Sequence, residues 1–164
     1  MVVVICLHED MHVGATDIVA ATTVWAMTAL LKNPRVMKKV QEEIRNLGGR
    51  KDFLNEDEIR KFPYFKAAST CTTTYPDVFF PERFLDNTID FRGLDFELIH
   101  LVLVVKCVLE YARSSLDLTL ANILNSFDWE LPAGTTKKEI DTEMLPGLTQ
   151  HKKNHLNVLA KCQI

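Results

Sequence analysis

Glycine is scarce in this sequence, and none of its six glycines lies between Gly93 and Gly134. That stretch therefore lacks the residue that tight, positive-φ turns usually need. Basic residues are not in excess either, with 19 Lys and Arg against 22 Asp and Glu, so the composition does not favour a nucleic-acid partner. The four cysteines are far apart and form no C-x-x-C pair, which argues against a zinc ribbon or dithiol motif and favours a reducing compartment.

The first residues do not form a long hydrophobic segment. The apolar run of residues 1–7 is too short to span a membrane, and no basic residue precedes it as in a signal peptide. We therefore expect no membrane anchor in this chain and a cytoplasmic location. The 164 residues, 47% of them hydrophobic and 25% charged, suffice for one modest globular core.

Residues 13–31 predict a buried helix, because apolar residues occupy all of its faces. Its one acid, Asp17, requires an explanation, since an unpaired carboxylate in apolar surroundings is strongly disfavoured. The spacing favours a helix that begins at Thr16 or Asp17, with that side chain capping the first free amides. Ala20 follows at the third position, so no capping box adds support.

His8, Glu9 and His12 form an H-E-x-x-H pattern, in which two histidines on one helical face bind zinc and the glutamate activates a water. A third ligand is not evident, because Glu42 and Glu43 lie on a helix face that we expect to be solvated. Histidines near a helix start more often face solvent than bind metal. A zinc metallopeptidase is therefore the alternative and not the main interpretation.

Short helices are predicted after residue 32. Asn33 can cap a helix that begins at Pro34 and stops at Gly48-Gly49. An apolar stripe is predicted along this helix, formed by Met37, Val40, Ile44 and Leu47. On the opposite side, two ion pairs are predicted between residues one helical turn apart, Lys38–Glu42 and Lys39–Glu43. Asn55 and Glu58 have the spacing of a capping box, which predicts a further short helix ending before Phe62-Pro63.

The remaining segments give mixed signals. Threonines in residues 70–74 favour extended structure, and the valine-rich run of residues 100–111 suits a buried strand or an aggregation-prone segment. Apolar spacing predicts a helix over residues 116–127 and alternation predicts a strand over 127–131. Residues 145–149 and 156–160 predict two strands joined through residues 151–154.

Several motifs resemble plant cytochromes P-450. The run Gly14-Ala15-Thr16-Asp17-Ile18, with the Ala-Ala-Thr-Thr-Val-Trp-Ala-Met run that follows, is similar to the central helix of that family. In the family an acid and a threonine of this helix lie over the haem and deliver protons to bound oxygen. Asp17 and Thr16 match family positions, but Ile18 stands where the threonine is expected.

The resemblance continues and then breaks. The family pattern is matched by four further segments: residues 33–67, 76–85 with Pro-Glu-Arg-Phe, 91–99 and 148–154. The family carries Glu-x-x-Arg on the helix that comes after the first of these segments, but this sequence reads Ser-Thr-Cys-Thr-Thr-Thr there. In the family those charges lock to the arginine of Pro-Glu-Arg-Phe. Here Glu82 and Arg83 keep that structural motif, but we expect Arg83 to be a lone surface arginine.

The iron-binding cysteine loop is replaced by residues 100–113. Cys107 lies in a run with no glycine, so the turns that aim backbone amides at a haem-bound thiolate are not available. Codons permitted for residues 100–111 can spell Phe-Gly-Ala-Gly-Ser-Lys-Met-Cys-Pro-Gly-Ile in another frame, which suggests a frame shift. The coding DNA tests that hypothesis.

The resemblance implies an incomplete cytochrome P-450 fold, mainly α with a small C-terminal β hairpin. We expect a single partial domain over residues 1–164. Its expected segments are the central and following helices in 10–66, the Pro-Glu-Arg-Phe segment in 76–99, the disrupted haem loop in 100–113 and the late helix and strands in 114–164. Intact members are haem monooxygenases of the endoplasmic reticulum membrane, which oxidise small apolar plant metabolites with oxygen and electrons from NADPH through a reductase. We expect this chain to bind no haem and to be inactive.

Overall fold

The computed structural model describes residues 2–49, 51, 53–74, 79–85, 101–147 and 149–162, with the side chains of 2–13, 72–74 and 101–109 outside the described part. Its elements, in order, are α1 (Val2–Lys32), α2 (Pro34–Gly48), α3 (Glu56–Ile59), α4 (Pro63–Thr74), the 3-10 helix η1 (Pro81–Phe84), α5 (Leu101–Ser126), β1 (Phe127–Glu130) and β2 (Leu159–Cys162). The fold is mainly helical with a small two-stranded antiparallel sheet, as predicted.

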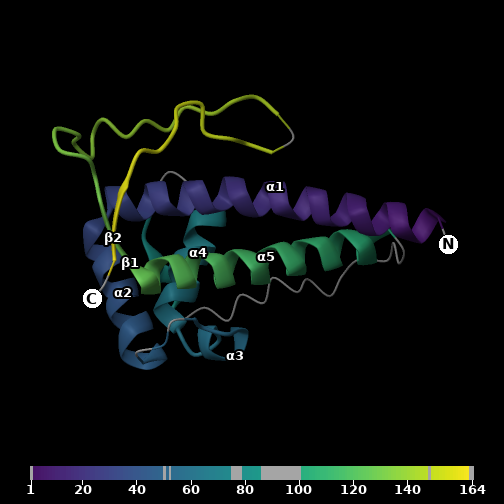
Figure 1. The fold of residues 1–164 in the computed structure, drawn as a ribbon, viewed down its shortest axis with the longest axis horizontal. Helices are drawn as coiled ribbons and strands as arrows, with labels where there is room; N and C mark the ends of the chain where they lie inside the picture. The colour runs from purple at the N-terminus through teal and green to yellow at the C-terminus, as the bar shows by residue number, and fades with distance from the viewer. Residues whose placement is uncertain are drawn as a thin grey trace.

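Two long helices form the axis of the molecule. Helices α1 and α5 run side by side, and α2 and α4 pack against them at one end (Figure 1). Each of these helices contributes fully or almost fully buried side chains to one core, including Leu30, Val40, Ile44, Phe65, Leu120 and Leu124. The burial of this apolar surface is the main force that holds the helices together.

Helix α1 is longer than predicted. Its backbone is helical from Val2, so the prediction that Thr16 or Asp17 caps the helix start is wrong. Amides at those positions lie in the helix interior and already bond to carbonyls four residues earlier. The part Gly14–Lys32 is long and apolar enough to cross a membrane by length and composition, but its residues Ala26, Leu30 and Leu31 are buried in the core.

Helix α2 begins and ends where the sequence predicts, but the predicted cap by Asn33 is wrong, because the Asn33 side chain donates to the Ala29 carbonyl at 2.9 Å and makes no capping hydrogen bond. Pro34 occupies the first turn, and the helix stops before Gly49, whose φ is 71°. The predicted stripe is buried except for Leu47, which is 61% exposed. The Lys38–Glu42 pair forms at 3.8 Å.

The predicted Lys39–Glu43 pair is replaced by tertiary contacts. Glu43 accepts hydrogen bonds from the backbone amides of Tyr64 and Phe65, at 3.0 and 2.7 Å. Those amides belong to the first turn of α4 and have no carbonyl partner within their own helix. Glu43 is thus not simply solvated, because it caps a neighbouring helix.

The capping box of α3 is confirmed. The Asn55 side chain accepts a hydrogen bond from the Glu58 amide, and the Glu58 side chain accepts one from the Asn55 amide, both at 3.0 Å.

Two predictions of extended structure are wrong. Residues 70–74 continue α4, and residues 101–111 belong to α5. In α4 the buried side chains of Phe65, Ala68 and Cys71 lie on the side that packs on the core. The packing of α4 exceeds the small helix penalty of threonine, which is at most about 0.7 kcal/mol per residue.

The sheet pairs different segments from those expected. Strand β1 forms as predicted, and its partner is β2, with Phe127 opposite Cys162 and Glu130 opposite Leu159. The predicted pairing of residues 145–149 with residues 156–160 is wrong. The C-terminal segment instead folds back on itself through a single antiparallel bridge between Met144 and Lys152. The Leu145 amide donates to the His151 carbonyl at 2.8 Å beside that bridge.

Candidate functional site

Asp17 lies on the side of α1 that faces the C-terminal segment. Its Oδ1 is 3.2 Å from Nε2 of His151, and the Asp17 side chain is 48% exposed. A hydrogen bond with Thr149, partly opposed by desolvation and aided by His151, lowers the pKa of Asp17 below its usual value. Asp17 is therefore an ionised carboxylate that is already bound to another part of the chain.

The hydroxyl groups of α1 do not replace the threonine missing at Ile18. Ile18 is half-buried, and its carbonyl accepts the hydroxyl of Thr22 at 2.7 Å. The hydroxyls of Thr23 and Thr28 likewise donate to carbonyls four residues earlier, at 2.7 and 2.8 Å. These protons are engaged in the helix's own backbone, while Thr16 lies on its exposed side.

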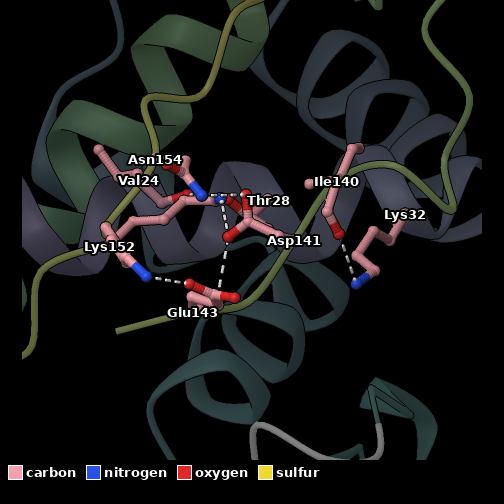
Figure 2. A network of polar contacts seen from close by, with 9 residues as sticks. Val24, Thr28, Lys32, Ile140, Asp141, Glu143, Lys152 and Asn154 are labelled. Atoms are coloured by element: carbon pink, nitrogen blue, oxygen red, sulfur yellow. Dashed lines mark hydrogen bonds and ion pairs between the residues drawn. The ribbon is translucent and has the colours of Figure 1, made fainter. Parts of the chain in front are cut away.

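The C-terminal segment is fastened along α1 at two further points. Trp25 donates its indole N–H to the carbonyl of Gln150 at 2.8 Å, and Lys32 Nζ donates to the carbonyl of Ile140 at 3.0 Å. Figure 2 shows Ile140 and Asp141 on the segment that crosses α1 beside Thr28 and Lys32. The segment therefore spans α1 from Lys32 to Asp17.

Asp141 holds the C-terminal segment in shape (Figure 2). Its carboxylate accepts hydrogen bonds from Lys152 Nζ at 2.9 Å, Asn154 Nδ2 at 3.1 Å and the Glu143 amide at 3.0 Å. The Lys152 side chain is only 4% exposed. The hydrogen bond from Lys152 is the main reason that the pKa of Asp141 falls to about 2.

Glu82 of the Pro-Glu-Arg-Phe turn joins three elements. Its Oε1 accepts from Arg35 at 3.1 Å and Lys39 at 3.3 Å on α2, and from the Tyr64 hydroxyl at 3.1 Å on α4. Burial is the main cause that raises the pKa of Tyr64 to about 12, with the Glu82 hydrogen bond adding to it. Glu82 thus connects the Pro-Glu-Arg-Phe turn to α2 and α4.

Arg83 is not a lone surface arginine. Its Nη2 lies 3.8 Å from Sγ of Cys71 on α4, and its guanidinium stacks at 4.9 Å over the Phe84 ring. Cys71 is fully buried. The prediction fails because α4 remains helical through this region and brings Cys71 to the Pro-Glu-Arg-Phe turn.

A buried acid was missed by the sequence reasoning. Asp117 of α5 accepts the Ser69 hydroxyl at 2.6 Å, and burial raises the pKa of Asp117, partly opposed by that bond and by Arg113 and Lys66. Arg113 also donates to Thr70 at 2.9 Å. The available signal was Asp117 directly beside Leu116 in an apolar helix pattern.

The backbone around Cys107 does not fit a haem-thiolate loop. Cys107 lies within α5, although its side chain is outside the described part. Interior amides of an α-helix bond to carbonyls of the same helix and cannot turn toward a sulfur. Asp17 does not fit an open oxygen site either, since His151 and Thr149 already engage it.

The H-E-x-x-H pattern lies on helix α1. His8, Glu9 and His12 lie on the helical backbone of α1, as the pattern requires, but their side chains are outside the described residues. Among the side chains that the structure does describe, no group of three or more His, Cys, Asp or Glu could hold a metal ion.

The family model of cytochrome P450 matches residues 3–69. Among plant relatives, cytochrome P450 71A9 of Glycine max is 31% identical and cytochrome P450 71B35 of Arabidopsis thaliana is 33% identical, each over 90% of this chain and 39% of the relative. A phenylacetaldehyde oxime monooxygenase of Prunus mume is 31% identical over 90% of this chain and 38% of its own length. The chain thus spans less than half the length of these relatives. With its P450-type central helix and Pro-Glu-Arg-Phe turn, it is a partial member of the plant cytochrome P450 family.

Proposed function

We propose that this chain derives from a haem-thiolate monooxygenase and does not itself carry out the monooxygenase reaction. The relatives support that kind of function for the family, and one is named as an oxime monooxygenase. In the proposal, the oxidation of small apolar metabolites, the use of NADPH-derived electrons through a reductase and residence at the endoplasmic reticulum belong to intact members. This chain retains helices and a structural turn of that fold.

The helical backbone around Cys107 is the observation that carries the proposal. Residues 101–126 form one uninterrupted helix, and no glycine occurs in it. A thiolate bound to iron is stabilised by backbone N–H groups that point at the sulfur, and a helix interior has none to spare. The chain therefore lacks a built ligand loop at its only cysteine in that region.

The alignments support the absence of an internal block. The alignment with the Glycine max relative is 194 residues long, but it uses only 90% of the 164 residues of this chain. Some positions of the relative within the alignment therefore have no counterpart in this chain. This agrees with the sequence at residues 68–75, where the Glu-x-x-Arg charges are missing.

Haem titration tests the proposal. The purified chain and its Cys107→Ala variant are titrated with haem, while an intact plant relative serves as the positive control and tryptophan fluorescence checks that both proteins are folded. We expect identical, weak absorbance changes from wild type and variant. Tight binding that Cys107→Ala abolishes would overturn the proposal.

The zinc metallopeptidase is the rival in another functional class. Its support is the helical backbone that places His8 and His12 one turn apart. Metal analysis of the purified wild type and of His12→Ala separates the two hypotheses. Stoichiometric zinc that disappears in His12→Ala would favour the peptidase, and equal trace metal in both would count against it.

A further inference from the structure

Residues 141–155 form a flap between two anchored positions. Ile140, just before the flap, is 6% exposed within the core, and its carbonyl accepts from Lys32 Nζ at 3.0 Å. Leu156, just after the flap, is partly buried against the same core. Figure 1 shows the C-terminal segment extending over α1 from the sheet of β1 and β2. The two ends of the flap are therefore held in place, while the part between them lies over α1.

The two arms of the flap are tied to each other. The Leu145 amide donates to the His151 carbonyl at 2.8 Å. Asp141 on the first arm accepts from Lys152 at 2.9 Å and from Asn154 at 3.1 Å on the second (Figure 2). The Lys152 side chain is only 4% exposed, so this tie is shielded from water. The flap thus keeps its shape through bonds that do not involve α1.

The polar contacts that fasten the flap to α1 are more exposed. Asp17 bonds with His151 and Thr149, and the Asp17 and His151 side chains are 48% and 44% exposed. The indole N–H of Trp25 donates to the Gln150 carbonyl at 2.8 Å in an exposed position. Water competes for such contacts, so each one contributes little to stability. None of the flap residues that the structure describes is buried.

The flap covers one strip of α1. Asp17, Ala21 and Trp25 are four positions apart, so they lie one above the other on the same side of the helix. The flap bonds with the first and the last of them, and Ala21 between them is 6% exposed. Movement of the flap away from α1 would uncover this strip.

We propose that the flap opens and closes over α1 as one preformed unit, with hinges beside Ile140 and Leu156. Opening breaks the contacts of Asp17 and Trp25 and leaves the ties between the two arms intact. Exposed contacts open more readily than shielded ones, so the flap separates from α1 before its arms separate from each other. The chain thus contains a conformational switch that controls access to one side of α1.

Fluorine NMR of the full chain, labelled with 5-fluorotryptophan, tests the opening. The two tryptophans are Trp25 at the flap and Trp129 in β1, and a Trp129→Phe spectrum assigns their signals. Asp17→Asn should raise the open fraction that saturation transfer detects at Trp25 by roughly fivefold, the effect of weakening one typical hydrogen bond. The Trp129 signal should not change. Glu130→Gln, which removes an exposed pair in the sheet, is the matched control. Identical Trp25 behaviour in wild type and Asp17→Asn would overturn the proposal.

Hydrogen exchange distinguishes movement as a unit from unfolding of the flap. In Asp17→Asn the Leu145 amide should keep its wild-type exchange rate to within about twofold, because its bond to His151 remains. Asp141→Asn should accelerate exchange of the same amide by roughly tenfold or more, since it weakens the tie to Lys152. Equal acceleration of Leu145 in both variants would show that the flap unfolds, which contradicts the proposal. Neither measurement depends on whether the chain binds haem.

Discussion

Asp17 and His151 are 134 positions apart in the sequence, and their side chains meet with 3.2 Å between Oδ1 and Nε2. The acid of the family's central helix therefore fastens the C-terminal segment in this chain. Trp25 and Lys32 hold the same segment by its backbone carbonyls. Asp17, for which the resemblance implies proton delivery, is thus in contact with a distant part of the chain.

Replacing Asp17 with Asn should loosen the C-terminal segment locally. The neutral amide is a weaker acceptor for Thr149 and a weaker partner for His151, so amide hydrogen exchange of residues 149–153 should become faster while the α2 and α4 cores keep their protection. Glu130→Gln, which removes the exposed pair with Lys161 in the sheet, is the control. Unchanged exchange near His151 in Asp17→Asn would show that the contact does not hold the segment.

The Asp141–Lys152 contact predicts acid sensitivity of the C-terminal segment. The pKa of Asp141 is lowered from 3.8 to about 2, so its contribution to stability is complete above pH 3.8 and is lost as the pH falls through about 2. Asp141→Asn should remove this part of the acid transition and free the segment already at neutral pH. Limited proteolysis between residues 139 and 155 at pH 7 and pH 3 measures the difference, and equal cleavage of both proteins at pH 7 would contradict it.

Asp117 predicts a pH dependence of the opposite sign. Burial raises its folded pKa above 3.8, so its contribution is complete below pH 3.8 and is lost as the pH rises through the raised value. Urea unfolding of the wild type should therefore show greater stability near pH 4 than near pH 7 from this group, and Asp117→Asn should flatten that trend. Asn keeps an acceptor for the Ser69 hydroxyl, and an identical trend in both proteins would disprove the assignment.

Glu82 should matter more to stability than an exposed glutamate on the neighbouring helix. Glu82→Gln weakens charge-assisted hydrogen bonds from Arg35, Lys39 and the Tyr64 hydroxyl, and we expect a loss of about 1–3 kcal/mol in unfolding free energy. Glu42→Gln removes only the exposed pair with Lys38, for which the expected loss is about 0.5 kcal/mol or less. Chemical denaturation of the two variants measures the contrast, which would fail if both losses were equal.

Local signals predicted the parts of the fold that depend on neighbouring residues. The limits of α2 at Pro34 and Gly49, the capping box of α3 and the strand β1 all follow from residues within a few positions of one another, although the side chain of Asn33 does not cap α2. The predictions of extended structure for residues 70–74 and 101–111 are wrong, because β-branched residues disfavour helix only weakly.

Long-range contacts of the candidate site could not be predicted in the same way. Asp17 was identified, but its partner His151 lies at the far end of the chain. Arg83 contacts the sulfur of Cys71 and the ring of Phe84, and neither is an ion-pair partner that a pattern of charges could reveal. Asp117 carried only a weak local signal, and its Ser69 partner lies on another helix.

The central claim is that Cys107 does not bind haem iron in this chain. The most direct test is to add haem to the chain, reduce it, expose it to carbon monoxide and record its visible spectrum beside that of an intact plant relative. If the helical backbone at Cys107 prevents thiolate ligation, the chain should show no trace of the red-shifted band that thiolate-bound iron gives, while the relative shows it fully. A red-shifted band in this chain that is lost in Cys107→Ala would contradict the account and establish a working haem-thiolate centre.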